Sequence, residues 1–292
     1  MGVSTPRIGN RLQALTGTHV RFAGRALPAY QFFGYVGFAL AVPLSFTLVG
    51  VQRLSYAAMA MVVAAAVLAV IGQAIVTTLV HGEEDLVYYR HVLAVTVVAG
   101  VILWALGEAP LPYLDATIVG IGLVGAGGRV GCFMVGCCHG RPHEHGVAYG
   151  ASHTTAGFPA YLVGVRLFPI QLIEAAWLLG IVLAGSVIVA RHEVAGTALA
   201  FWAVAYAGGR FVFESMRADL ARHYVWRLSE AQWTSLAVAA AVVGAEVLGW
   251  MPVRWWHAAV LAGLTGAAIT LVWTRQFARH PRVSRSVGRT TS

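Results

Sequence analysis

The sequence of 292 residues contains no lysine, so all twenty of its basic side chains are arginine. Charged residues of both signs make up only 11% of the chain, whereas a soluble domain carries roughly twice that fraction. Hydrophobic residues account for 58% of the chain, and the mean hydropathy is +0.71. The composition therefore excludes an ordinary soluble protein and predicts a polytopic membrane protein.

Two further features are absent. The first 29 residues carry four arginines and lack the apolar core of a cleavable signal peptide. The three cysteines are too few for a disulfide framework, and two of them are adjacent. The net charge of +8 has two explanations that stay open. Arginines in loops signal membrane topology, and a guanidinium group can also hold a phosphate through paired hydrogen bonds.

Eight apolar runs are expected to form helices, and each is long enough to approach or cross a bilayer. They cover approximately residues 30–51, 56–80, 86–106, 114–136, 169–190, 194–216, 233–248 and 256–273. The predicted fold class is an all-α polytopic membrane protein with seven to eight transmembrane helices.

The predicted organisation has three parts. Residues 1–29 form a basic N-terminal segment, residues 30–274 the transmembrane domain, and residues 275–292 a basic disordered tail near the lipid headgroups. Within the transmembrane domain, residues 137–168 are rich in histidine, glycine and proline. This segment is too polar to span a membrane, so we predict a small loop subdomain between the fourth and fifth helices.

The fourth run carries one arginine, Arg129, inside a glycine-rich stretch. An arginine in a hydrocarbon environment is costly unless it faces a cavity or a counter-ion. Gly127 and Gly131 form a Gly-x-x-x-Gly pair, which allows neighbouring helix backbones to approach closely. A buried cation surrounded by glycine predicts a site that holds an anion.

Three charged residues at the end of the sixth run are expected to share one helical face. Arg210 and Glu214 are four positions apart, and Arg217 follows three positions later, which are the spacings of side chains that meet on an α-helix. Two interpretations remain open. The group is an internal ion pair that joins helices, or it is an anion site, because two arginines face one carboxylate.

Polar residues also mark the starts of the third and fifth runs. The third run opens with Tyr88, Tyr89, Arg90 and His91. Aromatic pairs at such positions are commonly anchors at the membrane interface, and an arginine there can extend to the headgroups. Near the start of the fifth run lies Glu174, where the helix dipole favours an acidic side chain.

A group of potential metal ligands follows the fourth run: Cys132, Cys137, Cys138, His139, His143, His145 and His153. Cysteine and histidine are the ligand types of zinc and copper. The spacing fits no known zinc knuckle, however, and adjacent cysteines rarely both bind one tetrahedral ion. We predict no metal and no cofactor, and a metal site stays as a rival hypothesis.

Five segments, in order along the chain, resemble the bacterial prolipoprotein diacylglyceryl transferase family. GGRVGCFMVGCCHGRP is similar to the family's Gly-Gly-Arg-x-Gly run and the Gly-Arg-Pro turn that follows it. FPIQLIEA is similar to its His-Pro-x-Gln-Leu-Tyr-Glu helix start. AYAGGRFVFESMRAD resembles its Tyr-Gly-x-x-Arg-Phe-x-x-Glu-x-x-Arg-x-x-Asp stretch. LSEAQWTSL and FFGYVGFAL resemble two further helix patterns, and the whole resemblance covers roughly residues 30–250.

The resemblance implies transfer of a diacylglyceryl group from phosphatidylglycerol to the thiol of a lipobox cysteine in a pre-lipoprotein. It implies that the lipid phosphate is bound by Arg129, Gly140, Gln171, Glu174, Arg210 and Arg217. The guanidinium groups would stabilise the charge of the departing phosphate. The residues to which we assign catalytic roles are Tyr89, His91, Arg129, His139, Arg210 and Glu214.

The chain departs from the family pattern at three places. Tyr89 stands where the family has a histidine, Cys132 stands where an asparagine is usual, and a further apolar run occurs near the C-terminus. An unperturbed tyrosine has a pKa of ~10 and is a poor base at neutral pH. His91, His139 or Glu214 would then accept the thiol proton. We favour an orienting role for Glu214, because a carboxylate between two guanidinium groups is a weak base.

The implied partners are phosphatidylglycerol and the signal peptide of a pre-lipoprotein, with no nucleic acid. The implied location is the bacterial inner (plasma) membrane, crossed several times. Two rival hypotheses remain. The chain is a divergent family member that acts on another acceptor, or it is a non-catalytic membrane protein that binds or transports anionic lipids.

Overall fold

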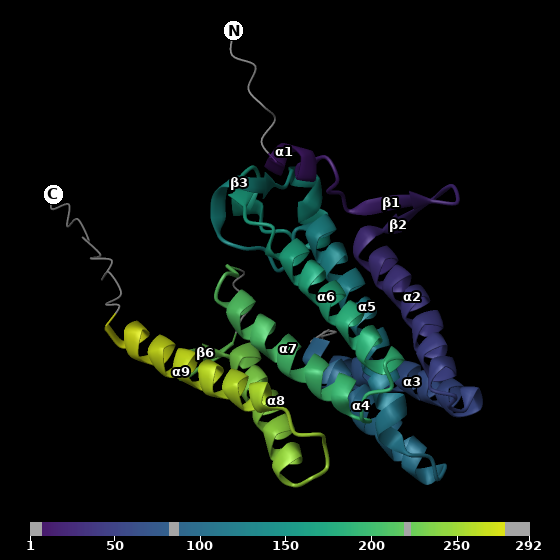
Figure 1. The fold of residues 1–292 in the computed structure, drawn as a ribbon. Coiled ribbons are helices and arrows are strands. Elements are labelled where there is room, and N and C mark those ends of the chain that lie inside the picture. Colours follow the sequence, from purple (N-terminus) through teal and green to yellow (C-terminus); the bar gives the residue numbers. More distant parts are fainter. Residues whose placement is uncertain (1–7, 82–87, 219–222, 278–292) are drawn as a thin grey trace, which may run out of the picture.

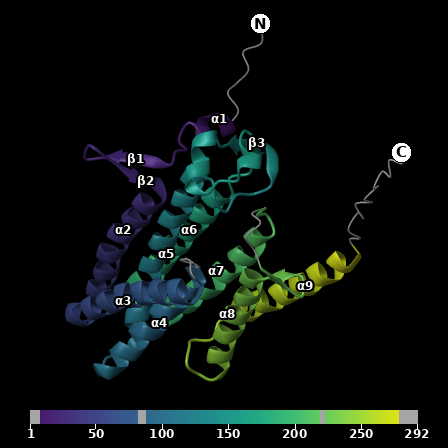
Figure 2. The same cartoon turned by 180° about the vertical axis from the view of Figure 1, so that it is seen from behind.

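The computed structural model describes residues 8–81, 88–218 and 223–277. A bundle of long helices lies below a small cap built from the N-terminal segment and the loop after the fourth predicted span (Figure 1). The same arrangement seen from behind places the cap at one end of the bundle and helices α8 and α9 at its side (Figure 2). Most of the predicted tail, residues 278–292, lies outside the described residues.

Helices form at all eight predicted positions. Their bounds are α2 (Ala29–Val51), α3 (Tyr56–His81), α4 (Tyr88–Ala105), α5 (Pro110–Val135), α6 (Ile170–Ala190), α7 (Thr197–Glu214), α8 (Glu230–Val247) and α9 (Trp255–Phe277). The polytopic all-α class is therefore confirmed. The ends agree with the predicted ends to within a few residues, because each apolar run is bounded by polar or turn residues.

Six of these helices are long and apolar enough to cross a membrane, compared with the seven to eight expected: α2, α3, α4, α5, α6 and α9. Helices α7 and α8 have 18 residues each. Two charged residues in each, Arg210 and Glu214 in α7 and Glu230 and Glu246 in α8, lower the hydropathy. Helix α7 is nevertheless largely buried among its neighbours, so its charged side chains face protein.

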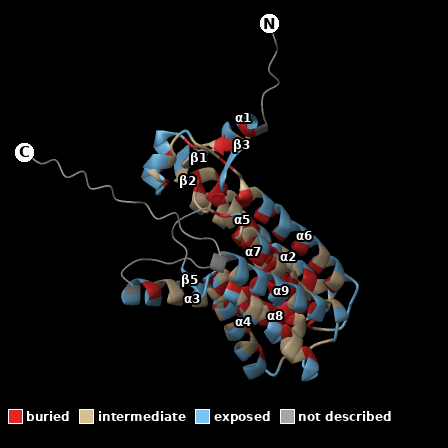
Figure 3. Cartoon of the chain, turned by 90° about the vertical axis from the view of Figure 1, so that its left-hand side faces the viewer, coloured by how far each residue is buried: buried red, intermediate tan, exposed pale blue. Residues whose placement is uncertain are grey.

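Many large apolar side chains of the helices are exposed, and exposed positions run along the helices of the bundle (Figure 3). Leu79, Trp104 and Leu183 are 81%, 77% and 69% exposed. Extended apolar surface of this kind is rare on a water-soluble protein. These faces are therefore suited to contact with lipid chains.

Helix α5 is the central element of the bundle, and it packs against α2, α4, α6 and α7. Its glycines permit the close approach that the sequence predicted. A Cβ atom on Gly127 would meet the backbone of Phe33 in α2, and one on Gly131 would lie 2.9 Å from the carbonyl oxygen of Tyr30. The predicted Gly-x-x-x-Gly pair thus forms the contact between α5 and α2.

A buried carboxylate joins the second turn of α5 to the start of α7. Asp115 of α5 is 3% exposed, and its two oxygens accept hydrogen bonds from the backbone N–H groups of Gly196 and Leu199, each at 2.7 Å. These are N–H groups that the helix itself leaves without partners at its N-terminus. Asp115 therefore caps α7 from a neighbouring helix and fixes the two helices together at this end.

The predicted loop subdomain is a compact unit with its own apolar core. It contains β3 (Pro142–Ala148), two 3-10 turns (Ala151–Ala156 and Ala160–Leu162) and β4 (Arg166–Leu167), which pairs with β3 in antiparallel fashion. Its core is formed by Phe133, Val147, Tyr149, Phe158 and Leu167. The subdomain closes the end of the bundle at which α5 stops and α6 begins.

The segment predicted as basic and N-terminal is partly ordered. It forms the short helix α1 (Ile8–Gln13), which contacts β3, and a hairpin of β1 (His19–Phe22) and β2 (Arg25–Pro28) that leads into α2. A second small hairpin, β5 (Tyr224–Val225) with β6 (Leu228–Ser229), precedes α8. Ser229 and Gln232 form a reciprocal capping box at the start of α8, as the Ser-x-x-Gln pattern indicates.

Candidate active site

The predicted anion site at Arg129 contains a buried ion pair. The Nε atom of Arg129, in the last third of α5, lies 2.6 Å from Oε2 of Glu174 in the second turn of α6. Their side chains are only 12% and 5% exposed. The other carboxylate oxygen of Glu174, Oε1, is buried and has no hydrogen-bond partner in the described part of the chain. The pair therefore keeps an acceptor that a ligand hydroxyl could use.

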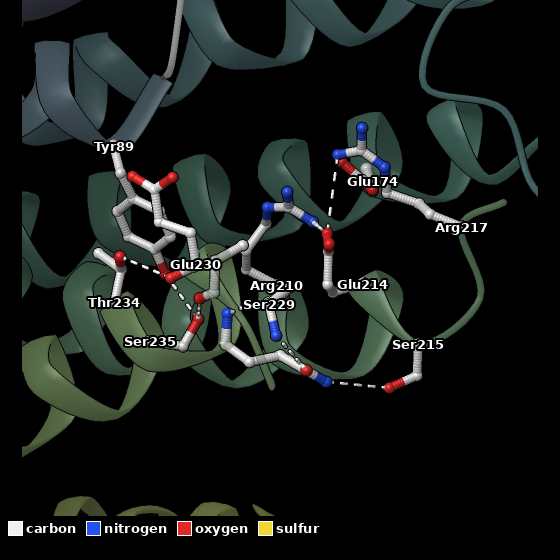
Figure 4. Close-up of polar contacts among 12 residues, drawn as sticks. Tyr89, Glu174, Arg210, Glu214, Ser215, Arg217, Ser229, Glu230, Thr234 and Ser235 are labelled. Carbon is white, nitrogen blue, oxygen red and sulfur yellow. Dashed lines mark hydrogen bonds and ion pairs between the residues drawn. The ribbon is translucent and has the colours of Figure 1, made fainter. Parts of the chain in front are cut away.

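The second predicted group, at the end of α7, also assembles. Glu214 Oε2 lies 2.5 Å from Arg210 Nη1 and 3.8 Å from Arg217 Nη1. All three side chains are 10% exposed or less. Both guanidinium groups point towards the carboxylate (Figure 4). The spacing on one helical face thus produced the expected geometry.

A tyrosine that sequence reasoning left without a role lies between these two groups. The buried hydroxyl of Tyr206 is close enough to Arg129 and Arg210 to interact with both. Its ring stacks on Trp202 at 4.9 Å and meets Tyr88 edge-on at 5.4 Å. The signal was present in the sequence, because Tyr206 precedes Arg210 by one helical turn and therefore lies on the same face.

The loop subdomain brings a third element to the same place. Gly140 forms a backbone bridge with Arg217, and the N–H of Ala218 donates a 3.0 Å hydrogen bond to the carbonyl oxygen of His139. Arg141 donates a hydrogen bond to the carbonyl oxygen of Ser215. These hydrogen bonds therefore connect the turn after α5 to the end of α7, beside the group formed by Arg210, Glu214 and Arg217.

Comparison with known proteins now identifies this arrangement. Residues 20–248 match the model of the family described as prolipoprotein diacylglyceryl transferase. The chain belongs to the prolipoprotein diacylglyceryl transferase family. A curated relative from Clostridium tetani (strain Massachusetts / E88), named phosphatidylglycerol–prolipoprotein diacylglyceryl transferase, is 30% identical over 128 residues. The alignment covers 43% of this chain and 49% of the relative, so the chain spans about half the length of that relative.

The resemblance inferred from the five segments is thus confirmed. The matched range contains both arginine groups and the loop subdomain, whereas α9 lies beyond it. The further apolar run near the C-terminus is therefore a helix that the family model does not cover. It packs against α7 and α8.

Tyr89, to which the resemblance assigns the place of the family's histidine, contacts helix α8. Its hydroxyl lies 3.0 Å from the hydroxyl of Ser235 in α8 (Figure 4), and its ring packs on Tyr206 at 5.1 Å. Arg210 is near enough to Tyr89 for electrostatic contact. His91 is half-buried on the same helix, α4. The prediction that one of these residues takes part in catalysis stays a prediction.

Gln171 contacts the cysteine turn directly. Its Nε2 donates a 2.7 Å hydrogen bond to the carbonyl oxygen of Cys137. Because Gln171 is 1% exposed and lies one turn before Glu174 in α6, it fixes the turn relative to the first arginine group. The assignment of Gln171 to phosphate binding remains untested, and its observed contact is a positioning one.

The structure brings together only part of the predicted group of metal ligands. The sulfur atoms of Cys132, Cys137 and Cys138 lie within 4.8 Å of one another, and none is in a disulfide. The histidines of the loop do not join this cluster in the described ranges; His143 and His145 are exposed. A site that combines cysteines with these histidines is thus disfavoured, whereas the three sulfur atoms remain a possible ligand set.

One thiol of the cluster has an unusual environment. Hydrogen bonds with the Cys132 and Cys137 thiols lower the pKa of the Cys138 thiol, and the guanidinium groups of Arg217 and Arg129 lower it further, although burial opposes them. Cys138 is therefore the thiol of this cluster that most readily becomes a thiolate.

We expect the variant in which Cys132, Cys137 and Cys138 are all serine to retain measurable transfer activity. The reaction that the resemblance implies uses the acceptor's thiol, and serine is close to cysteine in size. The check is an in vitro transfer assay on protein whose folding is verified by its melting temperature. Complete loss of activity at an unchanged melting temperature would show that an enzyme thiol takes part in the reaction.

Proposed function

We propose that this protein transfers a diacylglyceryl group from phosphatidylglycerol to a cysteine thiol in the signal peptide of a pre-lipoprotein, within the bacterial inner membrane. The observation that carries the proposal is a group of buried guanidinium groups at one end of the bundle. Those of Arg129, Arg210 and Arg217 are held in position by the carboxylates of Glu174 and Glu214. Guanidinium groups oriented in this way are suited to binding a phosphate.

A phosphodiester lipid fits this site in two ways. Its phosphate is negatively charged, and guanidinium groups bind phosphate oxygens through paired hydrogen bonds. The hydroxyl groups of a glycerol headgroup can donate to Glu174 Oε1, the buried oxygen without a partner among the described residues. The lipid-facing apolar surface of the bundle is compatible with a donor that arrives from the bilayer.

The chemistry required is a displacement at carbon. The acceptor thiolate forms a carbon–sulfur bond to the glycerol carbon of the diacylglyceryl group. The carbon–oxygen bond to the phosphodiester breaks, and glycerol phosphate leaves with the electron pair. Charge builds up on the departing phosphate in the transition state, so guanidinium groups already held in position by Glu174 and Glu214 would speed the reaction.

The thiol proton needs an acceptor, and we assign it to His139. The His139 ring is buried, and its Nδ1 lies 3.0 Å from the carbonyl oxygen of Gly140. A carbonyl oxygen can only accept, so Nδ1 carries the hydrogen and Nε2 of the neutral ring keeps its lone pair. The backbone of His139 is fastened beside Arg217, which places this residue near the proposed phosphate site.

We expect His139→Gln to lower the transfer rate by ~10²-fold or more, the usual contribution of a general base. His91→Gln serves as the comparison and should lower the rate by less than ~10-fold. The measurement is the initial rate of transfer as a function of pH. The assignment to His139 would be wrong if His139→Gln kept the acidic limb of the profile, where the rate falls as the base is protonated, and His91→Gln lost it.

The decisive experiment combines purified full-length protein in lipid nanodiscs with labelled phosphatidylglycerol and a lipobox peptide. Transfer is read as the mass increase of the peptide, with a peptide whose cysteine is replaced by serine as the control. Binding of phosphatidylglycerol without transfer would support the rival function as a lipid-binding or transport protein. Transfer to thiols other than the lipobox cysteine would favour the rival acceptor.

A further inference from the structure

Cys132, Cys137 and Cys138 form a cluster of three thiols at the turn after α5. Cys132 lies in the last turn of the helix, and the chain then reverses through two residues with left-handed backbone, Gly136 (φ 85°) and Cys138 (φ 52°). Cysteine rarely adopts that conformation. The result is a triangle of free thiols whose sulfur atoms are no more than 4.8 Å apart.

The size of this triangle matches a single bound ion. Metal–thiolate bonds are ~2.3 Å long, so three sulfur atoms around one ion in a plane are ~4.0 Å apart. Movements of less than ~1 Å would therefore close the observed triangle around an ion. A disulfide needs two of the sulfur atoms at ~2.0 Å, which would leave the third without a partner.

The surroundings favour a soft ion with three ligands. No histidine or carboxylate joins the three sulfur atoms within the described residues, whereas structural zinc almost always takes four ligands. Thiolates select monovalent copper. Cys138 also interacts electrostatically with Arg129 and Arg217, and their charge would stabilise an anionic complex of thiolates.

Access to the cluster is available from one side. Cys137 lines an open cavity of about 460 Å³ between the start of α2 and the loop subdomain, together with residues that include Tyr30, Gln31 and Thr155. On the other side, the amide of Gln171 holds the backbone of Cys137. The amide oxygen of Gln171, Oε1, is buried without a hydrogen-bond partner in the described part of the chain.

We propose that Cys132, Cys137 and Cys138 form a binding site for one monovalent copper ion. Three thiols release three protons, and Cu⁺ forms three copper–sulfur bonds, which gives a complex of charge −2. No electron is transferred in this step. The complex would interact electrostatically with Arg129 and Arg217, to which the proposed function assigns the lipid phosphate, so copper and lipid would compete for the same positive charge.

The test uses full-length protein in nanodiscs under anaerobic conditions, titrated with Cu⁺ against the chromophoric chelator bicinchoninate. We expect one equivalent of copper bound, with X-ray absorption showing a shell of three sulfur atoms. Each of Cys132→Ser, Cys137→Ser and Cys138→Ser should weaken binding by at least ~10²-fold, since loss of a supporting residue alone costs up to that much. The double variant His143→Ala/His145→Ala is the matched control and should bind copper as the wild type does.

Several results would overturn the proposal. Copper retained by the triple serine variant would place the ion elsewhere, and a shell containing nitrogen would contradict the ligand set. A disulfide in the freshly isolated protein would make the cluster a redox pair. Zinc that displaces copper from the site would contradict the identity of the ion. None of these readouts depends on transfer activity, so failure of the proposed function would leave the test of copper binding intact.

The expected competition between copper and lipid allows a further experiment, which rests on the proposed function. Saturating Cu⁺ should lower phosphatidylglycerol binding at least ~10-fold in the wild type and leave the triple serine variant unaffected. Equal inhibition of lipid binding in both proteins would show that copper acts at another place. No inhibition in either protein would refute the competition between copper and lipid. The copper titration would then still decide whether the three cysteines bind copper.

Discussion

Replacing Arg129 by alanine is expected to lower the transfer rate by ~10³-fold or more, the upper range for the loss of one group that stabilises developing charge. The guanidinium group is held by Glu174 at 2.6 Å, so it is oriented before the lipid arrives. Because alanine leaves the Glu174 carboxylate buried without a counter-ion, stability should also fall, by ~3–5 kcal/mol.

Arg129→Lys separates the two effects. Lysine keeps a positive charge near Glu174 and should restore most of the stability, yet it lacks the planar fork and should remain nearly inactive. The measurements are transfer rates at several lipid concentrations and melting temperatures in one detergent. Arg254→Ala is the matched control. It also removes an arginine from an ion pair, but the side chain of Arg254 is 40% exposed and its partner, Glu193, is not one of the proposed site residues. Wild-type rates in Arg129→Lys would show that only the charge matters.

Glu214→Ala should have the second-largest effect, because this carboxylate faces both Arg210 and Arg217. Its removal takes away the carboxylate that both buried guanidinium groups share, and breaking such an arrangement typically costs ~3–5 kcal/mol. We expect a large drop in melting temperature and little active protein.

Glu214→Gln tests whether the carboxylate orients the arginines or accepts the thiol proton. The amide oxygen can still accept one hydrogen bond, so an orienting role predicts a moderate loss of ~10-fold and an unchanged acidic limb in the pH profile, where the rate falls as the general base is protonated. A general base predicts a loss of ~10²-fold or more together with loss of that limb. We expect the first outcome. The second would transfer to Glu214 the role that we assign to His139.

Local patterns were sufficient for the helices and for contacts within one helix. Apolar runs predicted α2 to α9, and the i, i+4 and i+7 spacing predicted the Arg210–Glu214–Arg217 group. Each of these depends on residues that are neighbours along the chain, and helix geometry alone brings such residues together.

Contacts between distant segments could not be obtained in this way. The sequence analysis singled out Arg129 and Glu174 as separate candidate site residues. Their ion pair depends on the packing of α6 against α5, which the sequence does not reveal. Tyr89 meets Ser235 across 146 positions. The three cysteines were assigned no shared site, because the left-handed backbone at Cys138 that turns its sulfur towards the others leaves no pattern in the composition.

The cap that Asp115 places on α7 has a mechanical consequence for the site at the opposite end. Arg129 lies about 14 residues beyond Asp115 in α5, and Arg210 lies about 14 residues beyond Gly196 in α7, a lever of ~21 Å in each helix. The two helices are therefore joined at Asp115, and each carries one arginine at the other end of the lever, Arg129 in α5 and Arg210 in α7. A rotation of about 3° at the joint would part these ends by ~1 Å, a misplacement that can cost ~10²-fold in rate. Two hydrogen bonds of 2.7 Å at the far end of the bundle would therefore control the spacing of Arg129 and Arg210, to which we assign roles in the proposed reaction.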